Sequence, residues 1–175
     1  MKRVKKLNHL PNDVVYDSMN FPVGWLTLFA STQGIHSILW EDETHTDMCK
    51  AILKNCERNA HHEIITRTKQ QLTEYFDGKR NVFSLPLCFS GTPFQIQAWQ
   101  ELYKIPYGET ISYQEQASRL GDKKTARAIG LANGLNPIPI IVPCHRVIGS
   151  NGQLTGFGGG LENKAMLLQL ERGGS

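Results

Sequence analysis

The stretch of sequence that decides the fold is residues 112–132, SYQEQASRLGDKKTARAIGLA. Ser112 and Glu115 have the spacing of a capping box, which predicts a helix that begins here and stops at Gly121. A second helix is expected to begin near Lys123. Its buried side would carry small and apolar residues at helical spacing: Ala126, Ile129 and Ala132. Two short helices joined by a tight turn with glycine are typical of a helix-turn-helix.

Basic residues gather within the same stretch. Arg119, Lys123, Lys124 and Arg127 are opposed only by Asp122. Charge alone favours a solvated helix start for such a group. The last three basic residues, however, lie at the expected N-terminal end of the second helix, where free N–H groups and the helix dipole already favour phosphate. Their position therefore favours contact with DNA.

The segments before this stretch predict another helix and a hairpin. Thr92 and Gln95 form a capping-box pattern with Pro93 at the first helical position, so a helix is expected from there to Pro106. Its predicted buried face is apolar: Phe94, Ala98 and Leu102. Residues 23–40 contain two apolar runs separated by a polar turn, which indicates a β-hairpin.

Two amphipathic helices are expected after the hairpin, one over residues 46–57 and one that ends before Gly78. The predicted buried side of the first is Met48, Ile52 and Cys56. Residues 82–87 predict a short strand or an extended connection, because Pro86 disfavours a central strand. The fold class is therefore α+β: a small N-terminal antiparallel sheet with helices, then a mostly helical domain like a winged helix-turn-helix.

Composition is consistent with a folded protein of one or two domains. The chain has 175 residues, of which 40% are hydrophobic and 20% charged, so disorder and small disulfide-stabilised scaffolds are excluded. We divide it into an N-terminal α/β structural domain, residues 1–89, and a domain over residues 90–175 that carries the helix-turn-helix. The net charge of +3 is too small to indicate a nucleic-acid partner by itself. No apolar run follows the basic start or could span a bilayer, so we expect a cytoplasmic protein without a membrane partner.

Cys144 is the residue best placed for chemistry. Residues 137–143, PIPIIVP, are apolar and contain three prolines, so we expect a buried extended segment that delivers this cysteine. A free thiol has a pKa of about 8.5 and needs a nearby base or positive charge to react as a thiolate. His145 is the candidate base. Because consecutive side chains diverge, we expect a bridging water, with Glu171 on a closing helix holding the far ring nitrogen.

The remaining thiols and the histidine pair are interpreted as structural. Cys49, Cys56 and Cys88 show no CxxC spacing and are expected to be free thiols that pack as small hydrophobic residues. His61 and His62 lack further ligands at metal-binding spacing, so we expect solvated surface there. We therefore expect no metal and no cofactor.

Residues 141–147, IVPCHRV, resemble the active-site signature of the O6-alkylguanine-DNA alkyltransferases, which repair DNA in a single self-inactivating transfer. The similarity extends from about residue 91 to residue 171 through GTPFQ (91–95), IPYG (105–108), SY (112–113), RAIG (127–130) and NP (136–137). In the first half, only FPVG (21–24) and the hairpin after it are similar. Members with tryptophan in place of the cysteine do not transfer alkyl groups, so Cys144 groups this chain with the active members.

The resemblance implies a role for each matching position. Cys144 would accept the alkyl group from O6 of guanine, and His145, through water, with Glu171 would generate the thiolate. Tyr113 would protonate N3 of the leaving base. The implied substrate-binding residues are Asn136, Val147, Phe157 and Gly158. The implied DNA-binding residues, after base flipping and in the minor groove, are Arg127 as an intercalating finger, Ala126, Gly130, Lys123, Lys124 and Ser112.

The implied partner is double-stranded DNA with an alkylated base, bound by a monomer with weak sequence preference. Residues 90–175 would be the DNA-binding and alkyl-acceptor domain. Phe157 stands where many members have tyrosine, and Gly158 where others have serine or alanine. The pocket lip should then be roomier, which predicts acceptance of alkyl groups larger than methyl and of O4-alkylthymine.

Two other classes of function remain open from the residues alone. A cysteine hydrolase with a relay of cysteine, histidine and glutamate would turn over through an acyl-enzyme. A helix-turn-helix regulator would bind a specific DNA sequence without any chemistry at Cys144.

Overall fold

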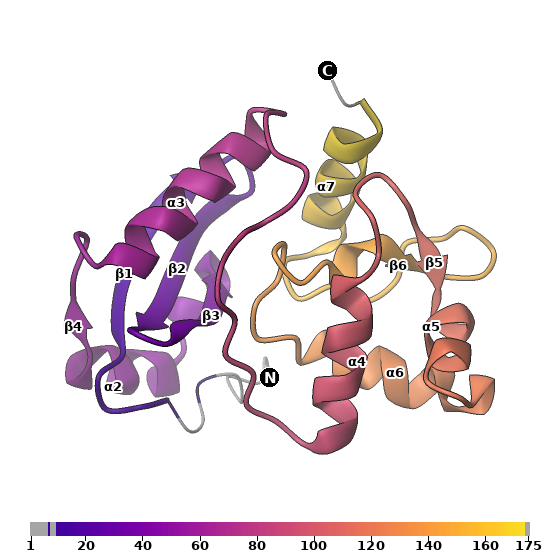
Figure 1. Ribbon diagram of the computed structural model, residues 1–175, viewed down its shortest axis with the longest axis horizontal. Coiled ribbons are helices and arrows are strands. Elements are labelled where there is room, and N and C mark those ends of the chain that lie inside the picture. Colours follow the sequence, from indigo (N-terminus) through magenta and orange to yellow (C-terminus); the bar gives the residue numbers. More distant parts are fainter. Residues whose placement is uncertain (1–6, 8–9, 174–175) are drawn as a thin grey trace. The chain divides into compact units, whose positions relative to one another are not determined.

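The computed structural model describes residue 7 and residues 10–173 (Figure 1). The chain forms two compact units, residues 1–90 and residues 91–175. Each unit has its own group of packed apolar side chains.

The first unit is built on a four-stranded sheet. Its strands are β1 (Val15–Phe21), β2 (Gly24–Ser31), β3 (Gly34–Trp40) and β4 (Glu57–Arg58), in the order β3-β2-β1-β4. The predicted hairpin over residues 23–40 is confirmed as the antiparallel pair β2 and β3. β1 is antiparallel to β2, and the short β4 is parallel to β1.

β1 is not predicted from its sequence, because polar residues interrupt its apolar pattern. Asp17 in the middle of this strand is only 2% exposed. Its carboxylate accepts hydrogen bonds from Arg58, at 2.7 Å from Nε, and from Lys69. A residue that disfavours strands is therefore stabilised here by ion pairs with residues more than 40 positions away, which no local pattern reveals.

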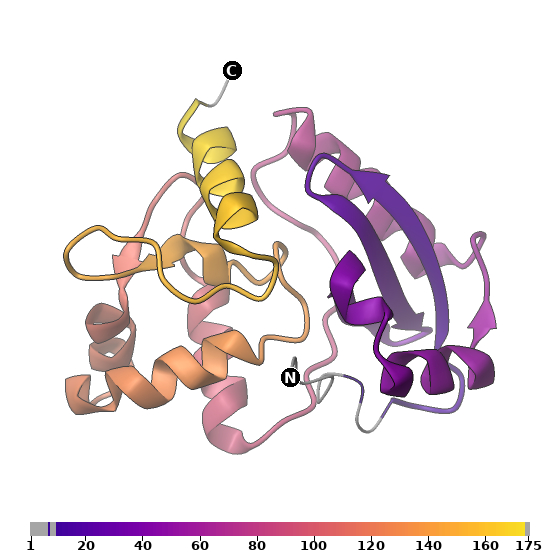
Figure 2. The same cartoon turned by 180° about the vertical axis from the view of Figure 1, so that it is seen from behind.

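Helices cover both faces of this sheet (Figures 1 and 2). α3 (Glu63–Phe76) lies on one face, and α1 (Glu41–Thr44) with α2 (Asp47–Asn55) lies on the other. The predicted buried side of α2 is right for Ile52, which packs against the core, and wrong for Met48, which is 50% exposed. Cys49 is fully buried instead, and Cys56 is already the C-cap. The apolar residues packed around Cys49 include Phe29 of β2, Leu39 of β3 and Val14 before β1, so tertiary contacts decide which face of the helix is buried.

Residues 82–87 form an extended connection beside β3. The Ile35 N–H donates to the Pro86 carbonyl, and the Cys88 N–H donates to the Ile35 carbonyl, both at 2.9 Å. A Cβ at Gly34 would lie 2.4 Å from the Pro86 oxygen, so only glycine permits this approach. The proline contributes its carbonyl to the edge of the sheet, where its missing N–H costs nothing.

The second unit is mostly helical, as predicted. Its helices are α4 (Pro93–Tyr103), α5 (Tyr113–Arg119), α6 (Ala126–Gly134) and α7 (Leu161–Gly173). Two short strands, β5 (Ile111–Ser112) and β6 (Val147–Ile148), pair in parallel. The core between α4, α5 and α6 consists of Ala98, Ala117, Ile129 and Ala132. None of the helices in the described part of the chain is both long enough and apolar enough to cross a membrane.

The helix-turn-helix formed by α5 and α6 differs from the prediction in two details. The Ser112 hydroxyl accepts from the Glu115 N–H at 3.0 Å, but the Glu115 carboxylate pairs with Arg119 instead of closing a capping box. The second helix begins with a 3-10 turn, η2 (Lys123–Thr125), before α6. Gly121, with φ of +104°, ends α5 as expected. The capping box predicted at the start of α4 has both of its hydrogen bonds.

A pair of buried amides joins α5 to α6. The Gln116 side chain donates to the Asn133 side chain at 3.0 Å and accepts from it at 2.8 Å. Gln116 also donates to the Ala98 carbonyl of α4 at 3.2 Å. These polar groups are buried and mutually satisfied, so the pair sets a defined packing of the three helices.

The segment before Cys144 is buried but not extended, which corrects the prediction. The Val142 N–H donates to the Ile138 carbonyl at 2.9 Å, so the chain folds back on itself. Ile140, at the centre of this turn, has a φ of +74°, which is rare for a β-branched residue. The prolines do exclude a helix, but a compact buried turn satisfies the same restriction. Asn151 and Gly152 form a turn as predicted, although β6 pairs with β5 and not with a hairpin partner.

Candidate active site

Cys144 begins a single turn of 3-10 helix, η3 (Cys144–Arg146). The preceding Pro143 has φ −83° and ψ 66°, and the Cys144 N–H donates to the Val142 carbonyl at 2.9 Å. This is the geometry of an inverse γ-turn, which reverses the chain just before the cysteine. In one helical turn the three successive side chains point in different directions. Cys144 keeps 8% of its area exposed, whereas His145 is fully buried.

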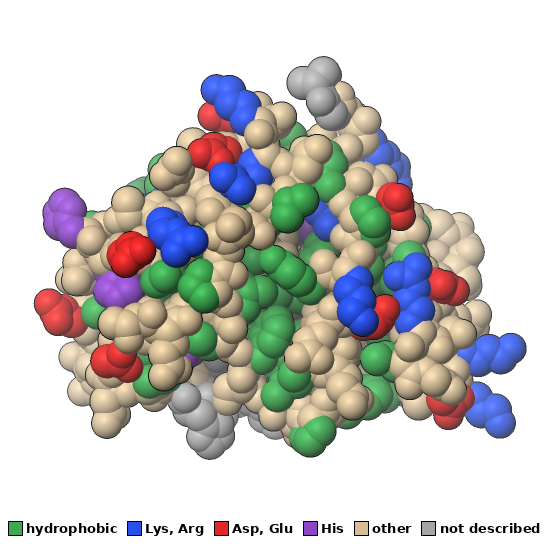
Figure 3. Space-filling view, viewed as in Figure 1, with side chains coloured by type: hydrophobic (Ala, Val, Ile, Leu, Met, Phe, Trp, Pro, Cys, Tyr) green, Lys and Arg blue, Asp and Glu red, His purple; other side chains and the backbone are tan. Residues whose placement is uncertain are grey.

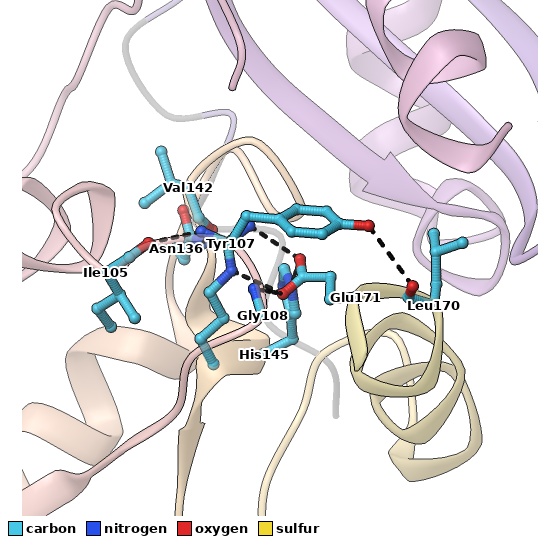
Figure 4. Close-up of polar contacts among 9 residues, drawn as sticks. Ile105, Tyr107, Gly108, Asn136, Val142, His145, Leu170 and Glu171 are labelled. Atoms are coloured by element: carbon cyan, nitrogen blue, oxygen red, sulfur yellow. Dashed lines mark hydrogen bonds and ion pairs between the residues drawn. The ribbon is translucent and has the colours of Figure 1, made fainter. Parts of the chain in front are cut away.

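Asn136 holds the segment that leads to Cys144, and Figure 4 draws it beside Val142 of that segment. Its side chain donates to the Val142 carbonyl at 2.8 Å and accepts from the Ile138 N–H at 3.0 Å. The residue is 1% exposed. Both ends of the amide are thus used to hold the folded-back segment, including the strained Ile140.

The predicted contact between His145 and Glu171 is present. His145 Nε2 lies 2.7 Å from a Glu171 carboxylate oxygen (Figure 4). Arg146 donates to the same carboxylate through Nε and Nη2, both at 2.9 Å, and to the Ile105 carbonyl through Nη1 at 2.6 Å. The Gly108 N–H donates to Glu171 as well, at 3.3 Å. Glu171 therefore fixes His145 and Arg146, two consecutive residues of η3, which we call the nucleophile turn.

The electrostatics of this buried group keep the histidine neutral. Burial by itself raises the pKa of Glu171, but hydrogen bonds from His145 and Arg146 outweigh it and bring the pKa to about 2. Burial lowers the pKa of His145, and the bond to Glu171 opposes this only in part. An ionised carboxylate accepts only, so Nε2 carries the proton and Nδ1 is left with its lone pair. His145 Nδ1 is buried and has no hydrogen-bond partner among the described residues. A neutral imidazole with a free acceptor nitrogen is what a general base requires.

Tyr113, at the start of α5, is linked to the loop that precedes α7. Its hydroxyl donates to the Thr155 carbonyl at 3.1 Å and accepts from the Thr155 hydroxyl at 3.3 Å. Phe157 and Gly158 lie further along this loop and are partly exposed. Val147, which follows η3, is fully buried.

Lys164 is a buried residue of this site that the sequence analysis did not identify. Its ammonium group donates to the Val147 carbonyl at 2.7 Å and to the Thr155 carbonyl at 2.9 Å. The lysine is fully buried. Its position one helical turn before Leu167 and Leu168, and two turns before Glu171, places it on the buried face of α7. That periodicity is the signal that could have found it.

The residues expected to bind DNA lie around α6. Arg127, Lys123 and Lys124 are exposed, and Lys and Arg side chains are visible on this part of the unit in Figure 3. Ala126 and Gly130 are partly buried small residues of α6. Ser112 serves as the N-cap of α5. The basic residues thus lie at the start of the second helix of the helix-turn-helix.

The other candidate groups lie away from Cys144 in the sequence and have structural roles. Cys49, Cys56 and Cys88 are free thiols whose pKa burial raises, which disfavours their thiolates. His62 caps α3 by accepting from the Ile64 N–H at 3.2 Å. Within the part of the chain that the structure describes, no group of His, Cys, Asp and Glu residues is arranged to hold a metal ion.

Comparison with known proteins identifies the family of this chain. Residues 93–173 match the family model of the DNA binding domain of 6-O-methylguanine DNA methyltransferase, and residues 14–89 match the ribonuclease-like domain of the same family. The chain therefore belongs to the 6-O-methylguanine DNA methyltransferase family. Among its relatives is the constitutive methylated-DNA–protein-cysteine methyltransferase of Bacillus subtilis, 45% identical over 160 residues that cover 90% of this chain and 94% of that protein. The corresponding enzyme of Mycolicibacterium paratuberculosis is 42% identical over 159 residues, covering 91% and 93%.

Solved structures lead to the same family. The crystal structure of Mycobacterium tuberculosis O6-methylguanine methyltransferase superposes with a TM-score of 0.83 at 40% identity and covers 93% of this chain and 94% of that one. A structure of the M. tuberculosis protein in complex with DNA superposes with a TM-score of 0.78 at 40% identity, covering 91% and 94%. The predicted family and fold class are confirmed.

Proposed function

We propose that this protein repairs DNA by moving the alkyl group of an O6-alkylguanine onto the sulfur of Cys144. The observation that carries the proposal is a neutral histidine, His145, directly after Cys144 in the chain. Its Nε2 atom is held by the carboxylate of Glu171. In this reaction His145, through a water molecule, accepts the thiol proton. The thiolate attacks the alkyl carbon, the new C–S bond forms and the C–O6 bond breaks. The electron pair of that bond stays with guanine, which Tyr113 protonates at N3, and the proton taken up by His145 returns through solvent to the Tyr113 phenolate.

The reaction runs once per protein molecule. A thioether carbon is a poor electrophile, so the product does not regenerate the thiol without a further nucleophile. The hydrogen bonds from Arg146 to Glu171 keep the carboxylate ionised, and Arg146 therefore acts through Glu171 and not on the substrate. The protein is then a stoichiometric reagent that needs no cofactor.

The helix-turn-helix presents the second unit to double-stranded DNA. Chemistry on a base requires its extrusion from the stack, which costs a few kcal/mol. Arg127 is exposed in the first turn of α6 and would fill the space the guanine leaves. The exposed Lys123 and Lys124 would bind phosphates, and the small residues Ala126 and Gly130 would allow α6 to approach the minor groove. The protein would bind as a monomer in the cytoplasm, with weak sequence preference and marked salt dependence.

The loop with Phe157 and Gly158 sets the range of substrates. Because glycine offers only its N–H at this lip, we propose that alkyl groups larger than methyl, and O4-alkylthymine, also react. Oligonucleotides with O6-methylguanine, O6-benzylguanine or O4-methylthymine would each transfer their alkyl group to Cys144. Strict rejection of the benzyl substrate, with rapid reaction of the methyl substrate, would contradict this part of the proposal.

The decisive experiment is the intact mass of the protein after incubation with an O6-methylguanine duplex. We expect a gain of one methyl group, mapped by peptide analysis to Cys144 and stopping at one equivalent. Cys144→Ala abolishes the gain, whereas Cys88→Ala, a change at a partly buried thiol of the first unit, leaves it intact. Repair of more than one equivalent of duplex, without a lasting adduct on the protein, would instead indicate an enzyme that turns over. Sequence-specific DNA binding without any adduct would indicate a regulator.

A further inference from the structure

Lys164 occupies a position that connects the parts of the site. Its ammonium group donates to the carbonyl of Val147, which follows η3, and to that of Thr155. Thr155 begins the glycine loop, residues 155–160, which leads to α7. The same Thr155 carbonyl accepts the Tyr113 hydroxyl. The ammonium also lies 5.9 Å from the centre of the Tyr113 ring. One buried lysine thus contacts three segments of the second unit, and one of them, at Val147, directly follows η3 with Cys144.

A fully buried lysine is expensive to keep unless something in its surroundings favours the charge. Burial lowers the pKa of Lys164, and a negative charge at Cys144 opposes this shift. The attraction is mutual, so a protonated lysine also favours the ionised form of the thiol. The two carbonyls satisfy two of the three ammonium protons and orient the group, but their dipoles do not replace a full counter-charge.

We propose that Lys164 is a positioning residue, whose ammonium group ties the nucleophile turn to the glycine loop and favours the thiolate of Cys144. The proposal rests on the function proposed above, and it adds a second group that favours ionisation of the Cys144 thiol. His145 removes the thiol proton, whereas Lys164 stabilises the negative charge that remains. By sharing the Thr155 carbonyl, Lys164 also weakens the hold of that oxygen on the Tyr113 hydroxyl, which must turn toward the leaving base.

Other titratable and charged groups face the same region. They are Cys144, His145 and Arg146 of η3, Tyr113 of α5, and Glu171 of α7. Glu171 is neutralised by Arg146 and bonded to His145, so it is committed to that part of the site. Lys164 is therefore the cation of this group that is not paired with a carboxylate in the described bonds.

The test measures the rate at which iodoacetamide modifies Cys144 as a function of pH, with the site read by peptide mass. Lys164→Met removes the charge with little change of shape and should shift the pH profile upward by about one unit, an approximately tenfold loss at pH 7 that is recovered at high pH. Lys164→Gln, which keeps a hydrogen-bond donor, should shift it equally. Lys164→Arg should largely restore the profile. Arg172→Met, a loss of the same charge from an exposed site on α7, should leave it unchanged.

The outcomes separate a role for charge from a structural one. Equal profiles for Lys164→Met and the unmodified protein would overturn the proposal, as would full restoration by Lys164→Gln. Because the assay needs no DNA, it stands even if methyl transfer to Cys144 is not found. Should the variants fail to fold, the wild-type protein offers a second measurement. Capping Cys144 with iodoacetamide removes the thiolate, so the NMR titration of the Lys164 side chain should move to lower pH. An unchanged titration would refute the proposal.

Discussion

Replacement of Glu171 by glutamine tests the charge at the centre of the site. Hydrogen bonds from His145 and Arg146 lower the pKa of this carboxyl from 4.5 to about 2 despite its burial. At about 1.4 kcal/mol per pKa unit, that shift corresponds to about 3 kcal/mol of folding free energy at neutral pH. Glu171→Gln keeps the shape of the side chain but leaves the buried Arg146 guanidinium without its counter-charge. We therefore expect the free energy of unfolding in urea at pH 7 to fall by about 3 kcal/mol.

The pH dependence of this loss identifies its cause. The folded pKa of Glu171 is depressed, so its contribution is complete above the unfolded value of 4.5 and disappears as the pH falls toward about 2. The difference in stability between the wild type and Glu171→Gln should therefore shrink between pH 5 and about pH 2. Glu162→Gln, an exposed change on the same helix, should have little effect at any pH. A difference that stays constant from pH 7 to pH 3 would show that the carboxylate charge is not responsible.

Three further predictions follow from single contacts. Asn133→Leu should lower the free energy of unfolding in urea by about 2–3 kcal/mol, because it leaves the buried Gln116 amide partly unpaired. The double variant with Gln116→Leu should lose less than the sum of the two single changes. Additive effects would refute the coupling. Asn136→Ala should slow methyl transfer at least tenfold, because it releases the turn before Cys144. The Kd for undamaged DNA should stay within about twofold, since the DNA-binding helix is not affected. An unchanged transfer rate would show that Asn136 does not hold this turn in its reactive geometry. Gly130→Ala should raise stability by up to about 1 kcal/mol, because the new methyl meets only the Tyr113 ring at 3.9 Å, yet weaken DNA binding; undiminished affinity would show that α6 does not approach the duplex closely.

Local sequence was sufficient for those elements whose signals lie within a few residues. The capping box of Thr92 and Gln95, the stop at Gly121 and the hairpin over residues 23–40 were all predicted, because caps and turns depend on side chains that reach their own backbone. Local patterns failed where remote partners decide. β1 contains a buried aspartate that is stabilised by Arg58 and Lys69, and the exposed or buried side of α2 is set by the sheet beneath it.

At the site, the residue types suggested Cys144 and His145 as a thiol and its base, with Glu171 as a candidate carboxylate, and the family resemblance strengthened the role of Glu171. Only the tertiary structure decided how they are held. It folds the proline-rich segment into a turn around Asn136 and directs Arg146 onto Glu171. It also buries Lys164 beside the nucleophile turn. The physical reason is that hydrogen bonds and charges across 17 to 26 sequence positions depend on packing of distant segments, which the linear order of residues does not specify.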